Sequence, residues 1–169
     1  MKGRKLAVVL TLCLLSVAGS GLSLYHVGYR INLSPSVPTG IWRVNEKGYE
    51  KTDYVVVSPN SHQGYELAIG RGYLPGFSPM LKRVVAVEGD VVDYDEKEKA
   101  VTVNGEYIMM TEIISQDTEG RKLPKASFPV TLRRGEIWLS SENIRGYDSR
   151  YFGPVSEDIL RKAAPVWIF

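Results

Sequence analysis

"MLKRVVAVEGDVVDY", residues 80–94, contains two valine-rich runs on either side of Gly89–Asp90. β-branched residues such as valine favour strands, and a glycine next to a small polar residue marks a turn. The stretch therefore predicts two consecutive strands joined by a short connection. Strands connected in this way pair antiparallel, which indicates an antiparallel β fold for this part of the chain.

Several neighbouring segments show the same composition. "KAVTVNGEYI" (99–108) places two β-rich arms around Asn104–Gly105, the strongest short signal for a β-hairpin. Short strands at close spacing, separated by turn residues, are typical of all-β domains. Further strands are predicted at 53–59, 135–142 and 164–169. We therefore expect a mostly β fold, an antiparallel sheet with a small inserted lobe at 95–130.

One segment of the β-rich region predicts a helix instead. "SEDILRKA" (156–163) begins with Ser156 as a candidate N-cap, followed by acidic residues in the first turn. Residues 58–79 are rich in Gly, Pro and Ser, and residues 109–130 are polar with two prolines. Both of these stretches are expected to be irregular.

The N-terminus predicts a membrane anchor, residues 1–28, ahead of a β-rich domain at 29–169. The basic "MKGRK" precedes residues 6–28, which contain no Asp, Glu, Lys or Arg. About 20 apolar residues span a bilayer, and basic flanks stay in the cytoplasm. A single-pass anchor with a cytoplasmic N-terminus and an extracytoplasmic domain follows. The alternative is a signal peptide cleaved near "SVAGS" (16–20), although apolar character continues past that point.

Composition argues against several classes of protein. The formal net charge is only +2, and Lys and Arg are scattered, so no nucleic-acid partner is expected. The single cysteine, Cys13, lies in the apolar run and cannot form an internal disulfide. With two separated histidines and one cysteine, the chain lacks the ligand cluster of a zinc site. We predict neither a metal nor a cofactor.

A lone serine in a rigid turn follows the anchor. In "SPSVPTG" (34–40), Ser36 stands between Pro35 and Pro38, which restrict the backbone on both sides. Such a turn usually only joins two parts of a chain. A serine nucleophile needs a base. His26 falls at the membrane interface, and His62 lies in an irregular stretch with no evident carboxylate to orient it, so a triad is poorly supported.

Lys82 offers a different base. Side chains alternate across a strand, so Lys82 and Arg83 face opposite ways and Lys82 shares a side with Met80 and Val84. A buried lysine has a lowered pKa, and its neutral amine can accept a proton from serine. Arginine cannot, because it stays charged. The alternative is an edge-strand lysine that guards against aggregation.

Three motifs in this order behind an apolar N-terminus resemble the type I signal peptidase family. They are "SPSVPTG", "LKRVVAVEGD" (81–90) and "YDSRYFGPV" (147–155). "RGYLPGFSPMLKRVVAVEGD" (71–90) is most similar to the TraF-type pilin peptidases of conjugative transfer. The resemblance implies a membrane-anchored serine peptidase with a Ser-Lys dyad on a signal-peptidase-like β domain.

The resemblance also implies roles for individual residues. Ser36 matches the nucleophile and Lys82 the general base. Ser34 matches a hydroxyl that helps to bind the oxyanion, with the Ser36 N–H as the second donor. Asp148 and Arg150 match a structural ion pair near the dyad. Many relatives carry a serine that orients the lysine where this chain has Gly146, and Ser149 or a backbone carbonyl is the candidate replacement.

Three functions are compatible with these residues. The first is a peptidase that matures a membrane-inserted conjugative pilin, by hydrolysis or by cyclisation, in the bacterial inner membrane with its domain in the periplasm. The second is a general signal peptidase acting on exported preproteins. The third is a non-catalytic pilus or secretion assembly protein. The expected partners are the substrate peptide, the membrane and components of a type IV secretion or conjugation system.

Overall fold

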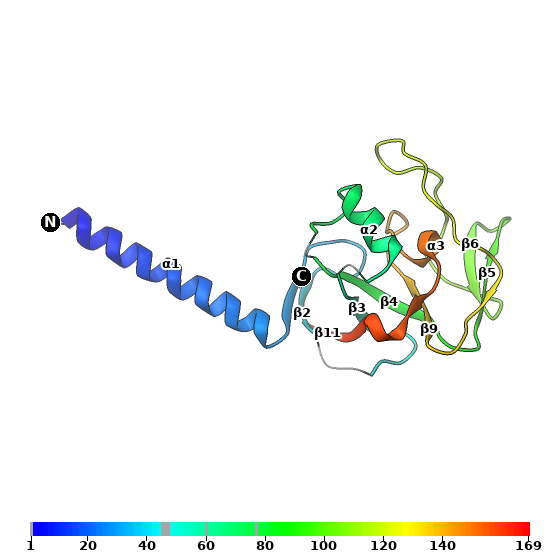
Figure 1. Cartoon of the computed structure of the whole chain (residues 1–169), viewed down its shortest axis with the longest axis horizontal. Helices are drawn as coiled ribbons and strands as arrows, with labels where there is room; N and C mark the ends of the chain where they lie inside the picture. The colour runs from blue at the N-terminus through cyan, green and yellow to red at the C-terminus, as the bar shows by residue number, and fades with distance from the viewer. Residues whose placement is uncertain (1, 45–47, 60, 77) are drawn as a thin grey trace.

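The computed structural model describes residues 2–44, 48–59, 61–76 and 78–169. Helix α1 (Lys2–His26) projects away from the remaining part of the molecule (Figure 1). Its stretch Gly3–His26 has a mean hydropathy of 2.1, and none of it is buried against other parts of the chain. A helix with leucine and valine exposed all round needs an apolar environment. This helix has the length and composition of a membrane anchor or of a signal sequence.

In the described part of the chain the main sheet is antiparallel and has seven strands, in the order β1-β2-β11-β3-β4-β9-β10. Strand β1 begins only a few residues after the end of α1, at the edge of the sheet. Strand β4 lies inside the sheet, with β3 on one side and β9 on the other. The strands are β1 (Tyr29–Asn32), β2 (Gly40–Val44), β3 (Tyr54–Val57), β4 (Met80–Ala86), β9 (Glu136–Ser140), β10 (Val155–Ser156) and β11 (Leu160–Ile168).

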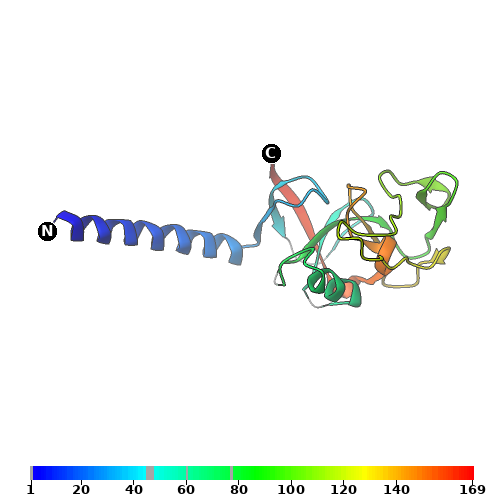
Figure 2. The ribbon, with the colours of Figure 1, turned by 90° about the horizontal axis from the view of Figure 1, so that it is seen from above.

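A second antiparallel sheet contains the strands between β4 and β9 in the chain, in the order β7-β6-β5-β8. It lies at the end of the molecule far from α1 (Figures 1 and 2). The predicted hairpin joins β6 to β7, and Asn104 and Gly105 have φ angles of 53° and 86°, as its tight turn requires. The strands are β5 (Val91–Asp95), β6 (Ala100–Val103), β7 (Glu106–Tyr107) and β8 (Val130–Thr131). The predicted antiparallel β fold is confirmed.

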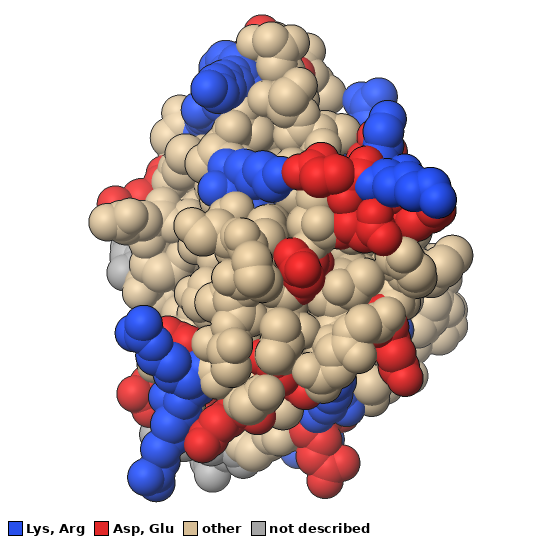
Figure 3. Space-filling model, turned by 90° about the vertical axis from the view of Figure 1, so that its right-hand side faces the viewer, with Lys and Arg blue, Asp and Glu red and all other residues tan. Residues whose placement is uncertain are grey.

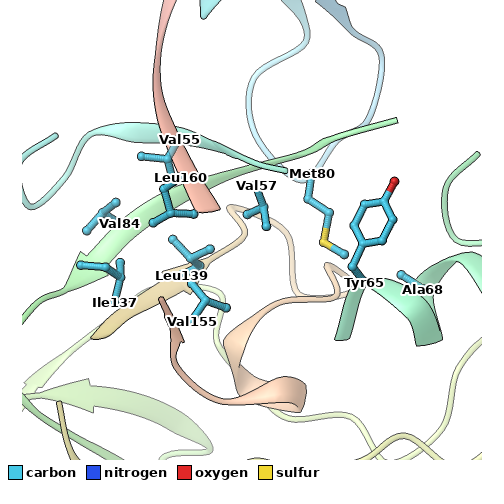
Figure 4. Packing of buried hydrophobic residues seen from close by; sticks show 10 residues of the cluster. All are labelled: Val55, Val57, Tyr65, Ala68, Met80, Val84, Ile137, Leu139, Val155 and Leu160. Carbon is cyan, nitrogen blue, oxygen red and sulfur yellow. The ribbon is translucent and has the colours of Figure 1, made fainter. Parts of the chain in front are cut away.

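Three apolar clusters hold the sheets together. One lies on one face of the main sheet, where side chains from β3, β4, β9, β10 and β11 meet Tyr65 and Ala68 of helix α2 (Gln63–Gly70) (Figure 4). Another lies on the opposite face around Val37 and Trp42. The third, around Trp138, joins the main sheet to the second sheet. Strand β4 contributes side chains to each of these clusters.

The predicted helix at 156–163 is wrong. Ser156 does accept a hydrogen bond from the Asp158 N–H, but it caps only one 3-10 turn (Glu157–Ile159). The chain then enters β11, where Leu160 packs into the cluster on one face of the sheet and Ala163 into the cluster on the other. Pairing with both β2 and β3 therefore outweighs the local helix signal.

The stretch 58–79, predicted to be irregular, contains helix α2. His62 caps this helix by accepting a hydrogen bond from the Gly64 N–H at 3.1 Å. Gly64 is needed because a Cβ there would overlap the ring of Phe152 in the short helix α3 (Ser149–Phe152). A two-turn helix with two glycines depends on this contact and carries little local signal.

The face that looks away from α1 carries Lys and Arg side chains interspersed with Asp and Glu (Figure 3). Mixed charges of this kind screen one another. This face therefore offers no broad region of a single sign for long-range attraction of a charged partner.

Candidate active site

The turn that carries Ser36 connects β1 to β2 and is fixed by one side chain. The Asn32 amide donates hydrogen bonds to the carbonyls of Ser34, Val37 and Pro38 at 2.9, 3.2 and 3.1 Å, and its oxygen accepts one from the Ser34 N–H at 3.1 Å. Val37 is buried beneath the turn. The prolines and Asn32 together hold Ser36 at the surface in one backbone conformation. Asn32 carries no recognisable signal in the sequence, because its contacts depend on the shape of the turn.

The two serines of this turn contact each other. Their Oγ atoms are 2.7 Å apart, and the Ser36 N–H donates to Ser34 Oγ at 3.3 Å. The Ser36 carbonyl accepts a hydrogen bond from the Glu142 N–H at 2.6 Å, which ties the turn to the segment after β9. The two groups expected to bind an oxyanion, the Ser34 hydroxyl and the Ser36 N–H, therefore lie side by side.

Lys82 is buried in the middle of the main sheet, with 4% of its surface exposed. It lies on the same side of β4 as Met80 and Val84, whereas the neighbouring Arg83 has 42% of its side chain exposed. Because β4 pairs on both sides, Lys82 is not an edge-strand lysine. Burial lowers the pKa of Lys82 from 10.5 to about 8; the nearby charge of Asp148 raises it and that of Arg150 lowers it further.

The Lys82 amine donates a hydrogen bond to Ser141 Oγ at 2.9 Å. Ser141 directly precedes Glu142, whose N–H binds the Ser36 carbonyl. The turn of Ser36 and the lysine are therefore connected through two adjacent residues. Within the described part of the chain, Ser36 Oγ is bonded to Ser34 and has no hydrogen bond to Lys82 Nζ. Catalytic hydrogen bonds are often long or absent before substrate binds.

The alternative base, His62, has a different role. Its Nδ1 is occupied by the Gly64 N–H, and its ring packs against Phe152 with 4.7 Å between the ring centroids. Its Nε2 is buried without a hydrogen-bond partner among the described residues. Burial lowers the pKa of His62 below its usual value. This histidine caps and packs a helix, and no carboxylate of the described residues orients it.

Asp148 and Arg150 form an ion pair, with 2.8 Å between Asp148 Oδ1 and Arg150 Nε, and both are fully buried. Asp148 also accepts a hydrogen bond from the Ser141 N–H at 2.8 Å. The Arg150 guanidinium donates to five backbone carbonyls, which belong to Met110, Glu112, Asn143, Ile144 and Gly146. The pair thus holds the turn at 143–146 and the irregular segment after β7 against the sheet.

Ser149, the candidate replacement for the missing serine, makes no hydrogen bond to the lysine among the described residues. Its hydroxyl accepts a hydrogen bond from the Leu139 N–H at 3.0 Å and so attaches α3 to β9. The hydroxyl beside Lys82 belongs to Ser141, a residue that the sequence analysis missed. "SSE" (140–142) ends a predicted strand. A strand-end serine gives no sign of its partner, which comes from a strand 59 residues away in sequence.

A groove of about 960 Å³ opens beside Ser34 and Ser36. One wall comes from the irregular segment 114–123 and another from the turn at 143–147. Asp117 fixes the first wall through hydrogen bonds from Tyr73 and Arg121 at 2.6 and 2.7 Å. Its volume lies within the range of ligand-binding clefts. Among the described residues no group of His, Cys, Asp and Glu is arranged to hold a metal ion.

Comparisons with known proteins identify the family of this chain. The family described as "Signal peptidase, peptidase S26" matches residues 4–168. The conjugal transfer protein TraF of Agrobacterium fabrum is 34% identical over 151 residues, covering 84% of this chain and 84% of that protein. A plasmid transfer protein TraF of Escherichia coli is 32% identical over 145 residues, covering 81% and 80%.

A signal peptidase I structure from Enterococcus faecalis covers 71% of this chain and 99% of its own, with 16% identity and a TM-score of 0.43. The family match spans nearly the whole chain, and the TraF relatives exceed 30% identity over most of it. The chain belongs to the peptidase S26 signal peptidase family.

Proposed function

We propose that this chain is a membrane-anchored serine endopeptidase in which Ser36 is the nucleophile and Lys82 the general base. The observation that carries the proposal is that Lys82 is buried in the sheet and that its pKa is lowered to about 8. Its amine binds Ser141, and the N–H of the next residue, Glu142, binds the carbonyl of Ser36. A charged lysine buried in a sheet lowers the stability of the folded state, and no structural role of Lys82 is evident among the described residues. A lowered pKa gives a useful fraction of neutral amine near neutral pH.

The reaction follows from these groups. Neutral Lys82 Nζ accepts the Ser36 Oγ proton while Oγ attacks the scissile carbonyl. The Ser34 hydroxyl and the Ser36 N–H donate to the oxyanion of the tetrahedral intermediate, so the Ser34–Ser36 contact must open. The peptide C–N bond then breaks, Lys82 returns the proton to the leaving amine, and an ester on Ser36 remains. Water, or an amine of the same substrate, then releases the acyl group with Lys82 again as base.

The proposed substrate is a membrane-inserted precursor, most simply a conjugative pilin. The support is the identity to proteins named for conjugal and plasmid transfer. The proposed partners are the precursor, the membrane and components of a type IV secretion or conjugation system. A general signal peptidase is the second candidate, because the matched family carries that name.

The substrate proposal is tested in cells. The pilin precursor of the same transfer region is co-expressed with the wild-type chain or with Ser36→Ala, and intact masses are measured. We expect a shortened pilin only with the wild-type chain. A cyclic product would be lighter than the hydrolysed product by one water molecule. Identical precursor masses in both cultures, together with processing of an exported preprotein, would replace the pilin proposal with the general signal peptidase.

For topology we propose a cytoplasmic N-terminus, α1 across the inner membrane, and residues 29–169 outside the cytoplasm with 95–130 as an inserted lobe. Lys2, Arg4 and Lys5 precede the apolar stretch of α1, and basic residues remain inside. An alkaline phosphatase fused after Phe169 should therefore be active, whereas a cytoplasm-dependent reporter at the same point should be silent. The opposite pattern, or a mature N-terminus near Ser20, would contradict the anchor.

A further inference from the structure

The hydroxyl that contacts Lys82 comes from a different element than the family resemblance predicts. We propose that Ser141, the residue directly after β9, is the positioning residue of the catalytic lysine, and that residue 146 is glycine because the Ser141 side chain fills the space that a serine there would need. This inference rests on the proposed function, because it assigns a partner to the proposed base.

The strand register places Ser141 opposite the lysine. Strands β4 and β9 pair antiparallel with Arg83 opposite Ser140. Continuing that register by one residue sets Lys82 opposite Ser141, and residues directly opposite in antiparallel strands have their side chains on the same face. Ser141 is 2% exposed, and its Oγ lies 2.9 Å from Lys82 Nζ. Among the described residues it is the only hydrogen-bond partner of this amine.

The backbone of Ser141 is fixed by the buried ion pair of Asp148 and Arg150. Its N–H donates to Asp148 Oδ2 at 2.8 Å, and the same carboxylate accepts from Arg150 Nη2 at 2.8 Å. A chain of buried contacts therefore runs from Arg150 through Asp148 to the Ser141 backbone and then to Lys82. This gives the ion pair a defined task, because it fixes the backbone that presents the Ser141 hydroxyl.

The space around Gly146 is already occupied by the Ser141 side chain. A Cβ added at this position would overlap both Cβ and Oγ of Ser141, and it would lie 3.0 Å from the Asn143 carbonyl oxygen. Side chains at 141 and 146 thus reach the same space, and only one of the two can hold a hydroxyl there. The orienting serine is therefore relocated from the turn before Asp148 to the residue that follows β9, rather than lost.

The contact with Ser141 has two consequences for the Lys82 amine. When the amine is charged, it donates to Ser141 Oγ, which stabilises the ammonium formed after proton transfer from Ser36. The same contact restrains the end of a flexible side chain, so that the lone pair of the neutral amine stays directed toward the nucleophile. Loss of the hydroxyl should therefore reduce kcat and leave KM nearly unchanged.

The experiment uses the full-length chain in detergent with a precursor peptide that spans the cleavage site. Ser141→Ala should lower kcat by about 10-fold to 100-fold, the loss expected for a hydrogen bond to a charged group. It should also move the acid limb of the pH profile to lower pH, because the ammonium has lost an acceptor. Ser61→Ala is the control, since it removes a half-buried hydroxyl that donates only to the Ser58 carbonyl, and its kcat and profile should match the wild type.

A second experiment moves the hydroxyl from residue 141 to residue 146 and tests the inference more strictly. Ser141→Gly should resemble Ser141→Ala, whereas the double variant Ser141→Gly with Gly146→Ser should recover most of the lost kcat and the wild-type pH profile. Gly146→Ser alone should lower the melting temperature, because two side chains then compete for one space. Equal rates for Ser141→Gly and the double variant would overturn the inference, as would a Ser141→Ala profile identical to the wild type.

A readout without catalysis separates this inference from the proposed function. The chain is labelled with [ε-¹³C]lysine, and the Lys82 signal, assigned by its absence in Lys82→Met, is titrated. We expect a lower Lys82 pKa in Ser141→Ala and a return toward the wild-type value in the double variant. If no form of the protein cleaves the precursor, the proposed function fails, while this titration still decides whether Ser141 holds the lysine. An unchanged pKa in Ser141→Ala would refute the contact.

Discussion

Replacing Lys82 with methionine or with arginine is expected to slow precursor cleavage by at least about 100-fold, the lower end of what a general base contributes. Methionine keeps the length of the side chain and removes the amine. Arginine keeps the positive charge but cannot become neutral, so it cannot accept the Ser36 proton. If both variants lose activity to a similar degree, the chemistry requires the neutral amine and not the charge.

Initial rates with purified full-length variants provide the measurement, and Lys162→Met provides the control. Lys162 is a lysine of the same sheet whose amine binds Asp53 at 2.7 Å near the surface, and its loss should leave the rate within about threefold of the wild type. Near-normal cleavage by Lys82→Arg would show that lysine is not the base, and His62 would then be the next residue to replace.

The folded state should tolerate Lys82→Met. The pKa of Lys82 is lowered from 10.5 to about 8, so between these pH values the unfolded chain binds more protons than the folded chain. The free energy of unfolding therefore rises with pH across this window. At neutral pH the protein carries the cost of a buried ammonium, which methionine removes. The melting temperature of Lys82→Met at pH 7 should accordingly be no lower than that of the wild type, so a lost rate would not reflect unfolding.

Arg150→Met is expected to lower the free energy of unfolding by about 3–5 kcal/mol. Breaking a buried ion pair by removing one partner leaves the other charge uncompensated, and this cost exceeds that of an exposed pair several-fold. Here the variant would leave the buried Asp148 carboxylate without its ion-pair partner. It would also leave five backbone carbonyls without the hydrogen bonds that the guanidinium donates. Denaturant unfolding of the wild type and the variant measures the difference.

Lys125→Met is the matched control for Arg150→Met. Lys125 binds Glu96 at 2.7 Å, but the two side chains are 46% and 77% exposed, and exposed pairs of this kind contribute little. A loss below about 1 kcal/mol in Arg150→Met would contradict the structural role of the buried pair.

Much of the architecture follows from local signals in the sequence. The Gly89–Asp90 break separates β4 from β5, and Asn104–Gly105 closes the hairpin of β6 and β7, because turns depend on residues that are adjacent in the chain. The side of β4 on which Lys82 lies was also predicted, since alternation along one strand suffices to place it with Met80 and Val84. Its burial depends on the pairing of β4 with strands on both sides.

What the sequence did not predict depends on contacts between distant segments. The local sequence of residues 156–163 favours a helix, but pairing with β2 and β3 places the second half of this segment in strand β11. Ser141 reads as an ordinary strand-end serine until the register sets it opposite Lys82. Its link to Gly146 appears only when the two backbones are brought together. These features are properties of the tertiary fold, and no window of neighbouring residues contains them.

The most direct test of the central claim, that a buried lysine activates Ser36, is the dependence of kcat/KM on pH for the full-length protein. Because the neutral amine is the active form, kcat/KM should rise about tenfold per pH unit below the pKa of Lys82 and level off above about 8. Ser36→Ala should show no cleavage at any pH. A profile that levels off near the ordinary pKa of histidine, about 6.5, or one that is flat from neutral pH upward, would contradict the lysine mechanism.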